Sequence, residues 1–210
     1  MKKEKVSSAV IRRLPRYYRH LTDLSLAGVV RISSNALGKS MNLTASQIRQ
    51  DLSCFGEFGQ QGYGYNVDSL RGQIAEILGM THHHTAVILG VGNLGRALME
   101  NFPFHRSGFD LTAAFDVAPE LIGKRISNVS IYQVSELERY LREHPTSVGV
   151  LTLPQSAAVQ MSELLVAGGV KGIWNFTNSE LHLENTNVIV ENVHFADSLL
   201  TLSYLISEET

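Results

Sequence analysis

The fold of this chain is decided by the stretch Thr85-Ala86-Val87-Ile88-Leu89-Gly90-Val91-Gly92-Asn93-Leu94-Gly95. Its first five residues are apolar or β-branched and have the length of a buried parallel strand. The next six follow the pattern Gly-x-Gly-x-x-Gly, and apolar side chains then recur at helical spacing up to residue 102. A second apolar strand covers residues 111–115 and ends at Asp116. This order of strand, glycine turn, helix, strand and acid predicts a Rossmann-type dinucleotide-binding unit.

Each residue of the motif has a physical role in such a unit. Gly90 permits the tight turn, Gly92 leaves room for a pyrophosphate, and Gly95 lets the helix pack closely on the sheet. Asp116, 21 residues beyond Gly95, is placed to accept hydrogen bonds from a ribose diol. Its charge would repel a 2′-phosphate, so the sequence favours NAD(H) over NADP(H). Another adenine nucleotide such as coenzyme A, or a Rossmann-like fold without a ligand, remains the alternative.

The alternation of strand and helix continues beyond Asp116. We expect strands at 129–132, 148–153, 170–174 and 188–190, with a helix at 135–143 capped by Ser135 and another at 156–166. This alternation predicts a doubly wound parallel sheet. Ligands in such folds lie beyond the carboxyl ends of the strands, which makes Asp116, Leu153-Pro154 and Asn175-Phe176 candidates to line the site. For Asn175 and Phe176 a plain turn is an equally open interpretation.

Composition and charge narrow the class of protein. The chain is 44% hydrophobic and 18% charged, as in ordinary globular proteins. We expect no membrane partner and no secretion, because no apolar run reaches transmembrane length and no signal peptide is evident. Cys54 is the single cysteine, which excludes an intramolecular disulfide and fits a cytoplasmic location. Residues 1–50 carry ten basic and two acidic side chains, a net charge of +8, whereas the whole chain carries −2; a basic segment of this kind suggests a polyanion-binding module.

Residues 9–55 have the pattern of a helix-turn-helix. A helix at 9–27 has a broad apolar stripe, in which Pro15 predicts either a kink or a later start. Ser33-Ser34 supplies the N-cap of a short helix that ends at Met41, and Thr44 caps a third helix. In that third helix Ala45, Ile48, Leu52 and Phe55 face inward, whereas the outward face carries Ser46, Gln47, Arg49, Gln50 and Ser53. Such a face suits base edges and phosphates in a major groove, with a plain solvated face as the alternative.

Residues 56–65 contain four glycines and three aromatic side chains, which we interpret as the β-hairpin wing of a winged helix. Core packing and DNA contact are equally open for Tyr63 and Tyr65. Asp68 is expected to cap a further helix that ends at Gly79. His82-His83-His84 is interpreted as a polar linker, because three consecutive histidines cannot all face one metal from a strand. The domains are therefore expected at 1–79 and 85–210, joined by a linker at 80–84.

The final segment, residues 195–206, leaves almost no polar face. A helix that is apolar all round needs burial on all sides, and a dimer interface is the economical solution, with a buried intramolecular helix as the alternative. No motif of a hydrolase, metalloprotease or P-loop enzyme is present, and little sequence remains for a substrate-binding region. We therefore expect a sensor rather than an enzyme. The rivals are an NAD-dependent enzyme with an accessory DNA domain, and a repressor that senses another nucleotide.

Taken together, these motifs resemble the Rex family of redox-sensing transcriptional repressors. The resemblance covers essentially the whole chain and is most specific at residues 14–18, 44–52, 55–59, 62–66, 90–95, 115–116 and 172–176. It implies a homodimer with N-terminal winged helices and C-terminal Rossmann domains that exchange their C-terminal helices. It also implies binding to palindromic operators, with release by NADH and with NAD+ permitting or favouring binding.

The resemblance assigns residues to each function and leaves no catalytic or metal-binding residue. Cofactor-binding candidates are Gly90, Val91, Gly92, Asn93, Leu94, Gly95, Asp116, Val117, Leu153, Pro154, Asn175, Phe176 and, reaching a partner's pocket, Phe195. DNA-binding candidates are Arg12, Arg13, Arg16, Ser46, Gln47, Arg49, Gln50, Gly62 and Tyr63. The chain departs from some family members at Phe102 and His194, where they carry Tyr and Asp linked to the switch; Asp197 and Arg19 are possible substitutes.

Overall fold

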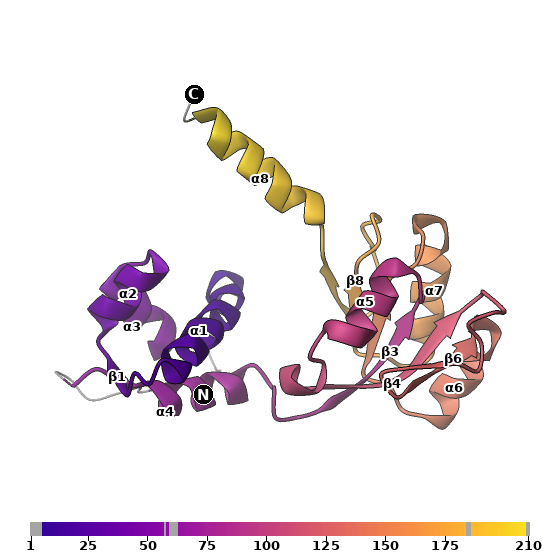
Figure 1. Ribbon diagram of the computed structural model, residues 1–210, viewed down its shortest axis with the longest axis horizontal. Coiled ribbons are helices and arrows are strands. Elements are labelled where there is room, and N and C mark those ends of the chain that lie inside the picture. Colours follow the sequence, from indigo (N-terminus) through magenta and orange to yellow (C-terminus); the bar gives the residue numbers. More distant parts are fainter. Residues whose placement is uncertain (1–5, 57, 59–62, 184–185, 209–210) are drawn as a thin grey trace. The chain divides into compact units, whose positions relative to one another are not determined.

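The computed structural model describes residues 6–56, 58, 63–183 and 186–208 (Figure 1). The chain divides into two compact units, Met1–Thr81 and His82–Thr210. The division falls within the expected linker at 80–84, although His84 already belongs to the first strand of the second unit. Among the helices described, none combines the length and the apolar character that crossing a membrane requires.

The first unit is a cluster of capped helices. In chain order it contains α1 (Ser8–Leu26), β1 (Arg31–Ile32), α2 (Ser34–Met41), α3 (Ala45–Ser53), β2 (Tyr65–Asn66) and α4 (Val67–Ile77). The hydroxyls of Ser33 and Thr44 accept hydrogen bonds from the first turns of α2 and α3, as the sequence predicts. The expectation that Asp68 caps α4 is wrong, because the Asn66 side chain accepts the hydrogen bond from the Ser69 N–H. Pro15 lies inside α1, which starts before it and continues past it.

A short antiparallel pair joins the segment after α1 to the segment before α4. Ile32 of β1 lies opposite Tyr65 of β2, and Arg31 lies opposite Asn66. The wing expected at 56–65 falls largely on residues 57 and 59–62, which lie outside the described part of the chain. The core beneath consists of apolar side chains from all four helices, among them Leu14, Leu21, Leu37, Ile48, Leu52, Leu70 and Ile74.

The second unit is built on a sheet of seven described strands in the order β5-β6-β4-β3-β7-β8-β9. The strands are β3 (His84–Leu89), β4 (Phe109–Asp116), β5 (Arg125–Ile126), β6 (Val129–Gln133), β7 (Val148–Leu151), β8 (Gly172–Asn175) and β9 (Ile189–Asn192). All neighbours are parallel except the edge pair β5–β6. The predicted parallel sheet is therefore present, with an antiparallel edge strand that the sequence did not reveal.

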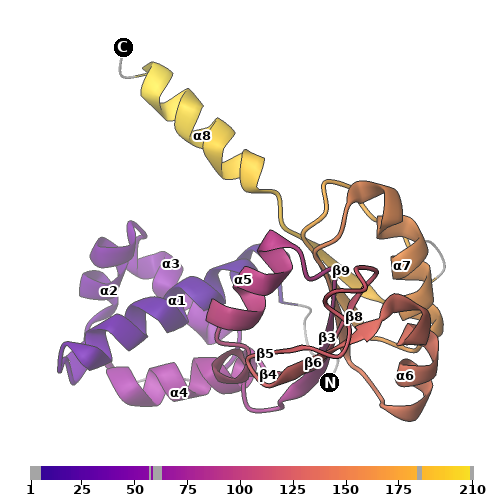
Figure 2. The same cartoon turned by 45° about the vertical axis from the view of Figure 1, so that its right-hand side comes forward.

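Helices cover both faces of this sheet, which is why its strands are apolar on both sides. Helix α5 (Asn93–Asn101) lies on one side, and α6 (Leu137–Glu143) and α7 (Gln155–Ala167) lie on the other (Figure 2). Alternating residues of β3 serve the two cores: Ile88 packs with Met99 of α5, whereas Val87 and Leu89 pack with Leu141 and Leu165.

Three details of this unit differ from the sequence expectations or extend them. The helix expected to be capped by Ser135 is preceded by a 3₁₀ turn, η2 (Val134–Glu136), so Ser135 lies inside that turn and α6 begins at Leu137. A second 3₁₀ turn, η1 (His105–Ser107), leads into β4. The final helix, α8 (Phe195–Glu208), is slightly longer than expected, and every one of its side chains is exposed.

Candidate functional site

The turn between β3 and α5 is built by backbone that only glycine can supply. Gly90 has a φ of +93°, and a Cβ there would lie 2.7 Å from the Thr152 carbonyl oxygen. A Cβ at Gly95 would overlap the carbonyl oxygen of Gly90. Gly95 is therefore required for the close packing of α5 on the turn, as its place in the motif predicts.

Gly92 differs from these two glycines. Its φ is −69°, and a Cβ built there meets no atom within 4 Å, so the chain itself does not require glycine at this position. Gly92 is also the N-cap of α5 and supplies no side-chain hydrogen bond to the first turn. The open space and the uncapped N–H groups have the form expected for an approaching pyrophosphate.

Asp116 lies at the end of β4, next to this turn. Its Oδ2 accepts a hydrogen bond from the Val91 N–H at 2.5 Å, and its Oδ1 accepts one from the Ala118 N–H at 2.9 Å. Each carboxylate oxygen has a further lone pair, and the side chain is only partly buried. The structure thus brings the acid and the glycine turn together, while Val117 beside it is 68% exposed.

The loops that follow β7 and β8 lie at the same edge of the parallel sheet. Leu153 is half-buried and Pro154 precedes α7. Asn175 is fully buried, and its amide donates to the Ser179 carbonyl and to Asn192 Oδ1 while its Oδ1 accepts from Thr177. Those bonds give Asn175 a structural role in shaping its loop. The ring of Phe176 lies 6.1 Å from that of Phe195.

Two features of this unit could not be found from the sequence. The Thr152 hydroxyl lies 2.7 Å from the Gly90 carbonyl and 3.1 Å from the Leu89 carbonyl, which fixes the turn from the neighbouring strand end. A cavity of about 480 Å³ is lined by aromatic side chains from separate segments, including Phe102, Phe104, Phe109 and Trp174. Phe102 packs against Phe104 and Trp174 there.

The outward face of α3 is polar, as expected. Ser46, Arg49 and Gln50 are exposed, and Arg49 Nη1 donates to the Ser34 hydroxyl at 3.0 Å. Gln47 is turned partly inward, where its Nε2 donates to Asp51 Oδ1 at 2.7 Å. Gln47 therefore has a partner within the protein that Gln50 does not share.

The three arginines proposed for α1 do not behave alike. Arg12 and Arg16 are exposed, whereas Arg13 is half-buried and pairs with the fully buried Asp51. Burial by itself raises the pKa of Asp51, but hydrogen bonds from Arg13, Tyr17 and Gln47 outweigh it, so the pKa lies below its ordinary value. The sequence does not reveal the role of Asp51, because its partner Arg13 is 38 residues away and lies on another helix.

Tyr63 is 70% exposed, and the Arg31 guanidinium lies over its ring at 6.0 Å while donating to the Tyr63 carbonyl at 3.1 Å. Of the two interpretations left open, Tyr65 takes the core position, since its side chain is buried in the apolar core of this unit. Gly62 lies outside the described residues.

This fold and these sites define a class: a helix-turn-helix unit joined to a Rossmann-type unit with a dinucleotide-type glycine turn. Residues 5–53 match a protein family described as "Putative DNA-binding protein N-terminus", and residues 81–179 match one described as "CoA binding domain". A redox-sensing transcriptional repressor Rex from Clostridium tetani is 47% identical over 208 residues, which cover 99% of this chain and 98% of that protein. The Rex of Clostridium acetobutylicum is 46% identical over 207 residues, 99% and 96% of the two chains. The chain belongs to the Rex family of redox-sensing transcriptional repressors.

Solved structures agree with this assignment. RSP, a Rex-family repressor, has been solved with β-NAD+ and operator DNA; that chain is 46% identical, with a TM-score of 0.91 and coverage of 98% of this chain and 94% of RSP. RSP with β-NADH is 43% identical with a TM-score of 0.91, covering 98% and 96%. The predicted family and the predicted order of a DNA-binding unit followed by a Rossmann-type sheet are confirmed.

Proposed function

We propose that this chain is a DNA-binding transcriptional repressor that senses the NADH/NAD+ ratio, binds palindromic operators as a homodimer and is released by NADH. One observation carries the nucleotide half of this proposal. Position 92 is a glycine although nothing in the chain requires one there, and the space next to it is open. Asp116, at the end of β4, is bonded to the same turn. RSP has been solved with β-NADH and with β-NAD+ and operator DNA, and these complexes support the proposal of the same ligands for the present chain.

The nucleotide would occupy the carboxyl edge of the sheet. The pyrophosphate would lie over Gly92 at the N-terminus of α5. The carboxylate of Asp116 would accept hydrogen bonds from the ribose hydroxyls through its remaining lone pairs. Leu153, Pro154 and Phe176 would line the remainder. Because a carboxylate repels a 2′-phosphate, NAD(H) is preferred to NADP(H).

The DNA would be read by α3. Ser46, Arg49 and Gln50 are exposed on its outward face and carry the donors and acceptors that base edges and phosphates need. Arg12 and Arg16 would contact phosphates. Arg13 acts mainly by fixing α3, since it reaches Asp51 from α1, and Gln47 is bonded to the same carboxylate from within α3.

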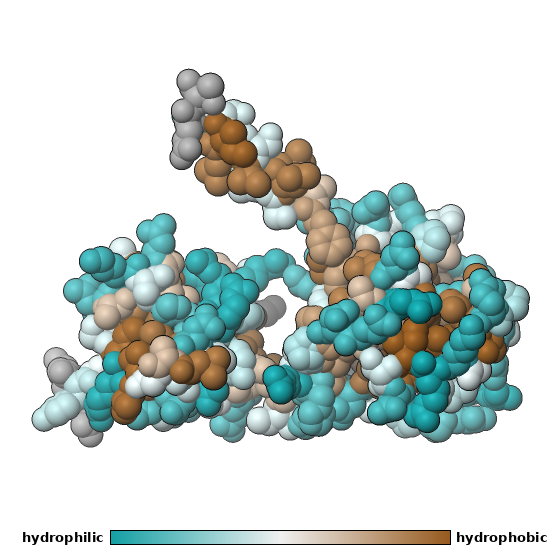
Figure 3. All heavy atoms as spheres, viewed as in Figure 1, coloured by the Kyte–Doolittle hydropathy of each residue, from teal (hydrophilic) through white to brown (hydrophobic). Residues whose placement is uncertain are grey.

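The homodimer would form through α8. Its large apolar side chains are between 52% and 67% exposed, and Figure 3 shows brown, hydrophobic residues along much of the helix. None of the described residues of α8 is buried. An exposed, contiguous apolar surface of this kind is typical of a protein–protein interface. A dimer with two-fold symmetry also matches a palindromic operator.

Sensing requires that NADH bind the DNA-competent and released states with different affinities, because equal binding shifts nothing. A typical coupling of about 1–3 kcal/mol corresponds to roughly 5–150-fold in operator affinity. We infer no catalytic activity, in keeping with the naming of the relatives as repressors. A cytoplasmic location follows from the proposed ligands, since the operator and the cellular NADH pool are both found there.

The test is operator binding by the purified protein at fixed salt, titrated separately with NADH, NAD+ and coenzyme A. We expect NADH to release the protein, with NAD+ much weaker or opposed and coenzyme A inert. An Asp116→Ala variant should need more NADH for release while binding the operator as tightly as the original chain. Release by coenzyme A alone would replace the ligand, and steady turnover of NADH with small aldehydes or keto acids would favour the enzyme alternative.

A further inference from the structure

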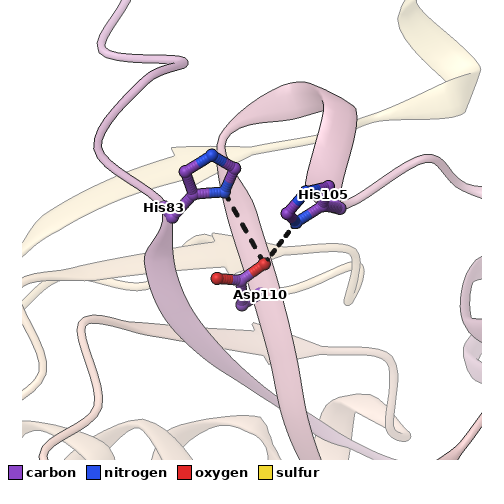
Figure 4. A group of neighbouring side chains, drawn as sticks. All are labelled: His83, His105 and Asp110. Carbon is purple, nitrogen blue, oxygen red and sulfur yellow. Dashed lines mark hydrogen bonds and ion pairs between the residues drawn. The ribbon is translucent and has the colours of Figure 1, made fainter.

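Two histidines and an aspartate from separate segments converge in the second unit (Figure 4). His105 Nδ1 lies 2.7 Å from Asp110 Oδ1, and His83 Nδ1 lies 3.7 Å from the same oxygen. The ring centroids of the two histidines are 4.5 Å apart, and the three potential ligand atoms all lie within 4.8 Å of one another. All three side chains are partly open to solvent, with exposed fractions of 42%, 77% and 43% for His83, His105 and Asp110.

We propose that His83, His105 and Asp110 form a binding site for a divalent first-row transition-metal ion of the Zn²⁺, Co²⁺ and Ni²⁺ class. Imidazole nitrogen and carboxylate oxygen are the donors such ions prefer, and three protein ligands with an open position are a common set. In a tetrahedral site with bonds of about 2.1 Å, donor atoms are roughly 3.4 Å apart. The atoms of the pair His83–Asp110 already have nearly this spacing. The atoms of the pair His105–Asp110 reach it when the proton on His105 Nδ1 is released to solvent and both atoms bind the ion instead of each other.

The backbone fixes these three positions. Thr85 of β3 pairs with Asp110 of β4, and the His84 N–H donates to the Gly108 carbonyl at 2.8 Å. Gly108, with a φ of +84°, turns η1 into β4 and so places His105 over Asp110.

The run of three histidines is therefore divided. The rings of His82 and His84 stack on each other at 5.8 Å, and His84 also lies against Phe109. His83 alone joins the cluster, with a φ of +48°. The interpretation of all three as a polar linker rests on the sequence alone, which does not show that β4 brings a carboxylate from 27 residues further on next to His83.

The proposed ion would lie far from the nucleotide. The cluster is at the amino ends of β3 and β4, whereas the glycine turn follows Leu89 at the carboxyl end of β3. Six strand residues separate them, roughly 20 Å at about 3.3 Å each. A bound ion would tie the first strand of the second unit to η1 and β4, and would be expected to raise the thermal stability of that unit.

The test uses the full-length chain without an affinity tag, titrated with ZnCl₂ by calorimetry and with CoCl₂ by visible absorption. We expect one ion per chain, a Co²⁺ spectrum of tetrahedral or five-coordinate type, and a rise in Tm with Zn²⁺. His83→Ala, His105→Ala and Asp110→Asn should each weaken binding about tenfold or more, since even loss of an outer-shell partner costs that much. His182→Ala is the matched control. His182 also lies 3.7 Å from a carboxylate, that of Glu180, but it does not belong to the group of three potential ligands found among the described residues.

Two results would overturn the proposal. One is the absence of stoichiometric Zn²⁺ binding to the original chain. The other is binding that His82→Ala or His84→Ala weakens while His105→Ala and Asp110→Asn leave it unchanged, which would place the ion on the histidine run alone. Unchanged circular dichroism and NADH binding of each variant would establish that a loss of metal affinity is not a loss of folding.

Discussion

Arg13 of α1 and Asp51 of α3 form a two-point ion pair, in which Nε donates to Oδ2 at 2.6 Å and Nη2 donates to Oδ1 at 2.8 Å. Asp51 is fully buried, and the Tyr17 hydroxyl donates to it at 2.8 Å. These bonds join the helix proposed to read DNA to the first helix of its unit. Bidentate geometry fixes the orientation of α3 as well as its position.

Removal of one partner of this pair should destabilise the first unit. Arg13→Ala leaves a buried carboxylate with only two neutral donors, and such losses typically cost about 3–5 kcal/mol. We expect the lower end, because Arg13 is 24% exposed. Urea unfolding at pH 7 measures the change. Arg71→Ala, which removes the half-buried partner of the exposed Asp68 in the same unit, is the control and should change the free energy of unfolding by less than about 1 kcal/mol.

The same carboxylate predicts a pH dependence. The folded pKa of Asp51 lies below its ordinary value, so its stabilisation is present above the unfolded pKa of about 3.9 and is lost as the pH falls through the folded pKa. The difference in unfolding free energy between the original chain and Asp51→Asn should therefore be constant from pH 7 to about 5 and shrink below about pH 4. A difference that stays the same down to pH 2 would show that the charge of Asp51 does not contribute.

Local features of this fold could be predicted from the sequence, whereas contacts between distant segments could not. Thr44 and Gly95 could be assigned because a cap and a glycine turn are local patterns, and the structure places both as expected. The sequence places Arg13 with Arg12 and Arg16, because a basic helix face favours phosphate contacts, and only the fold reveals its buried partner on another helix. The cluster at His83 was missed for the same reason, since its carboxylate comes from the neighbouring strand.

Gly92→Ala and Gly95→Ala should separate binding from folding. A methyl group at Gly92 meets no protein atom, so we expect a free energy of unfolding within about 0.5 kcal/mol of the original. Its methyl group would nevertheless lie where the pyrophosphate approaches, and NADH affinity measured by fluorescence should fall at least about tenfold. Gly95→Ala, which overlaps the Gly90 carbonyl, should instead lower the unfolding free energy by about 1–3 kcal/mol. Undiminished NADH affinity in Gly92→Ala would move the nucleotide site elsewhere.

Charges placed on the apolar surface of α8 should dissociate the proposed dimer. In the double variant Leu199→Glu with Leu202→Glu, two carboxylates would be buried without partners, and we expect the dimer dissociation constant to rise about a hundredfold or more. Light scattering after size-exclusion chromatography over a range of concentrations measures this. The control adds the same charge at Ser198 and Thr201, whose hydroxyls bond within the helix. Equal mass for all three proteins at every concentration would exclude α8 as the interface.

Gln50→Ala and Gln47→Ala should have different effects although both side chains are amides on α3. Gln50 is exposed, so its loss should leave stability unchanged and cost about 1–3 kcal/mol in operator binding, with relaxed sequence preference. Gln47 donates to the buried Asp51, so its loss should lower the free energy of unfolding by about 1.5–3 kcal/mol, the range for a hydrogen bond to a charged group. Operator and scrambled duplexes at one salt concentration, compared with urea unfolding, distinguish the two. If Gln47→Ala loses sequence preference at unchanged stability, then Gln47 reads bases, and its bond to Asp51 is exchanged for one to DNA.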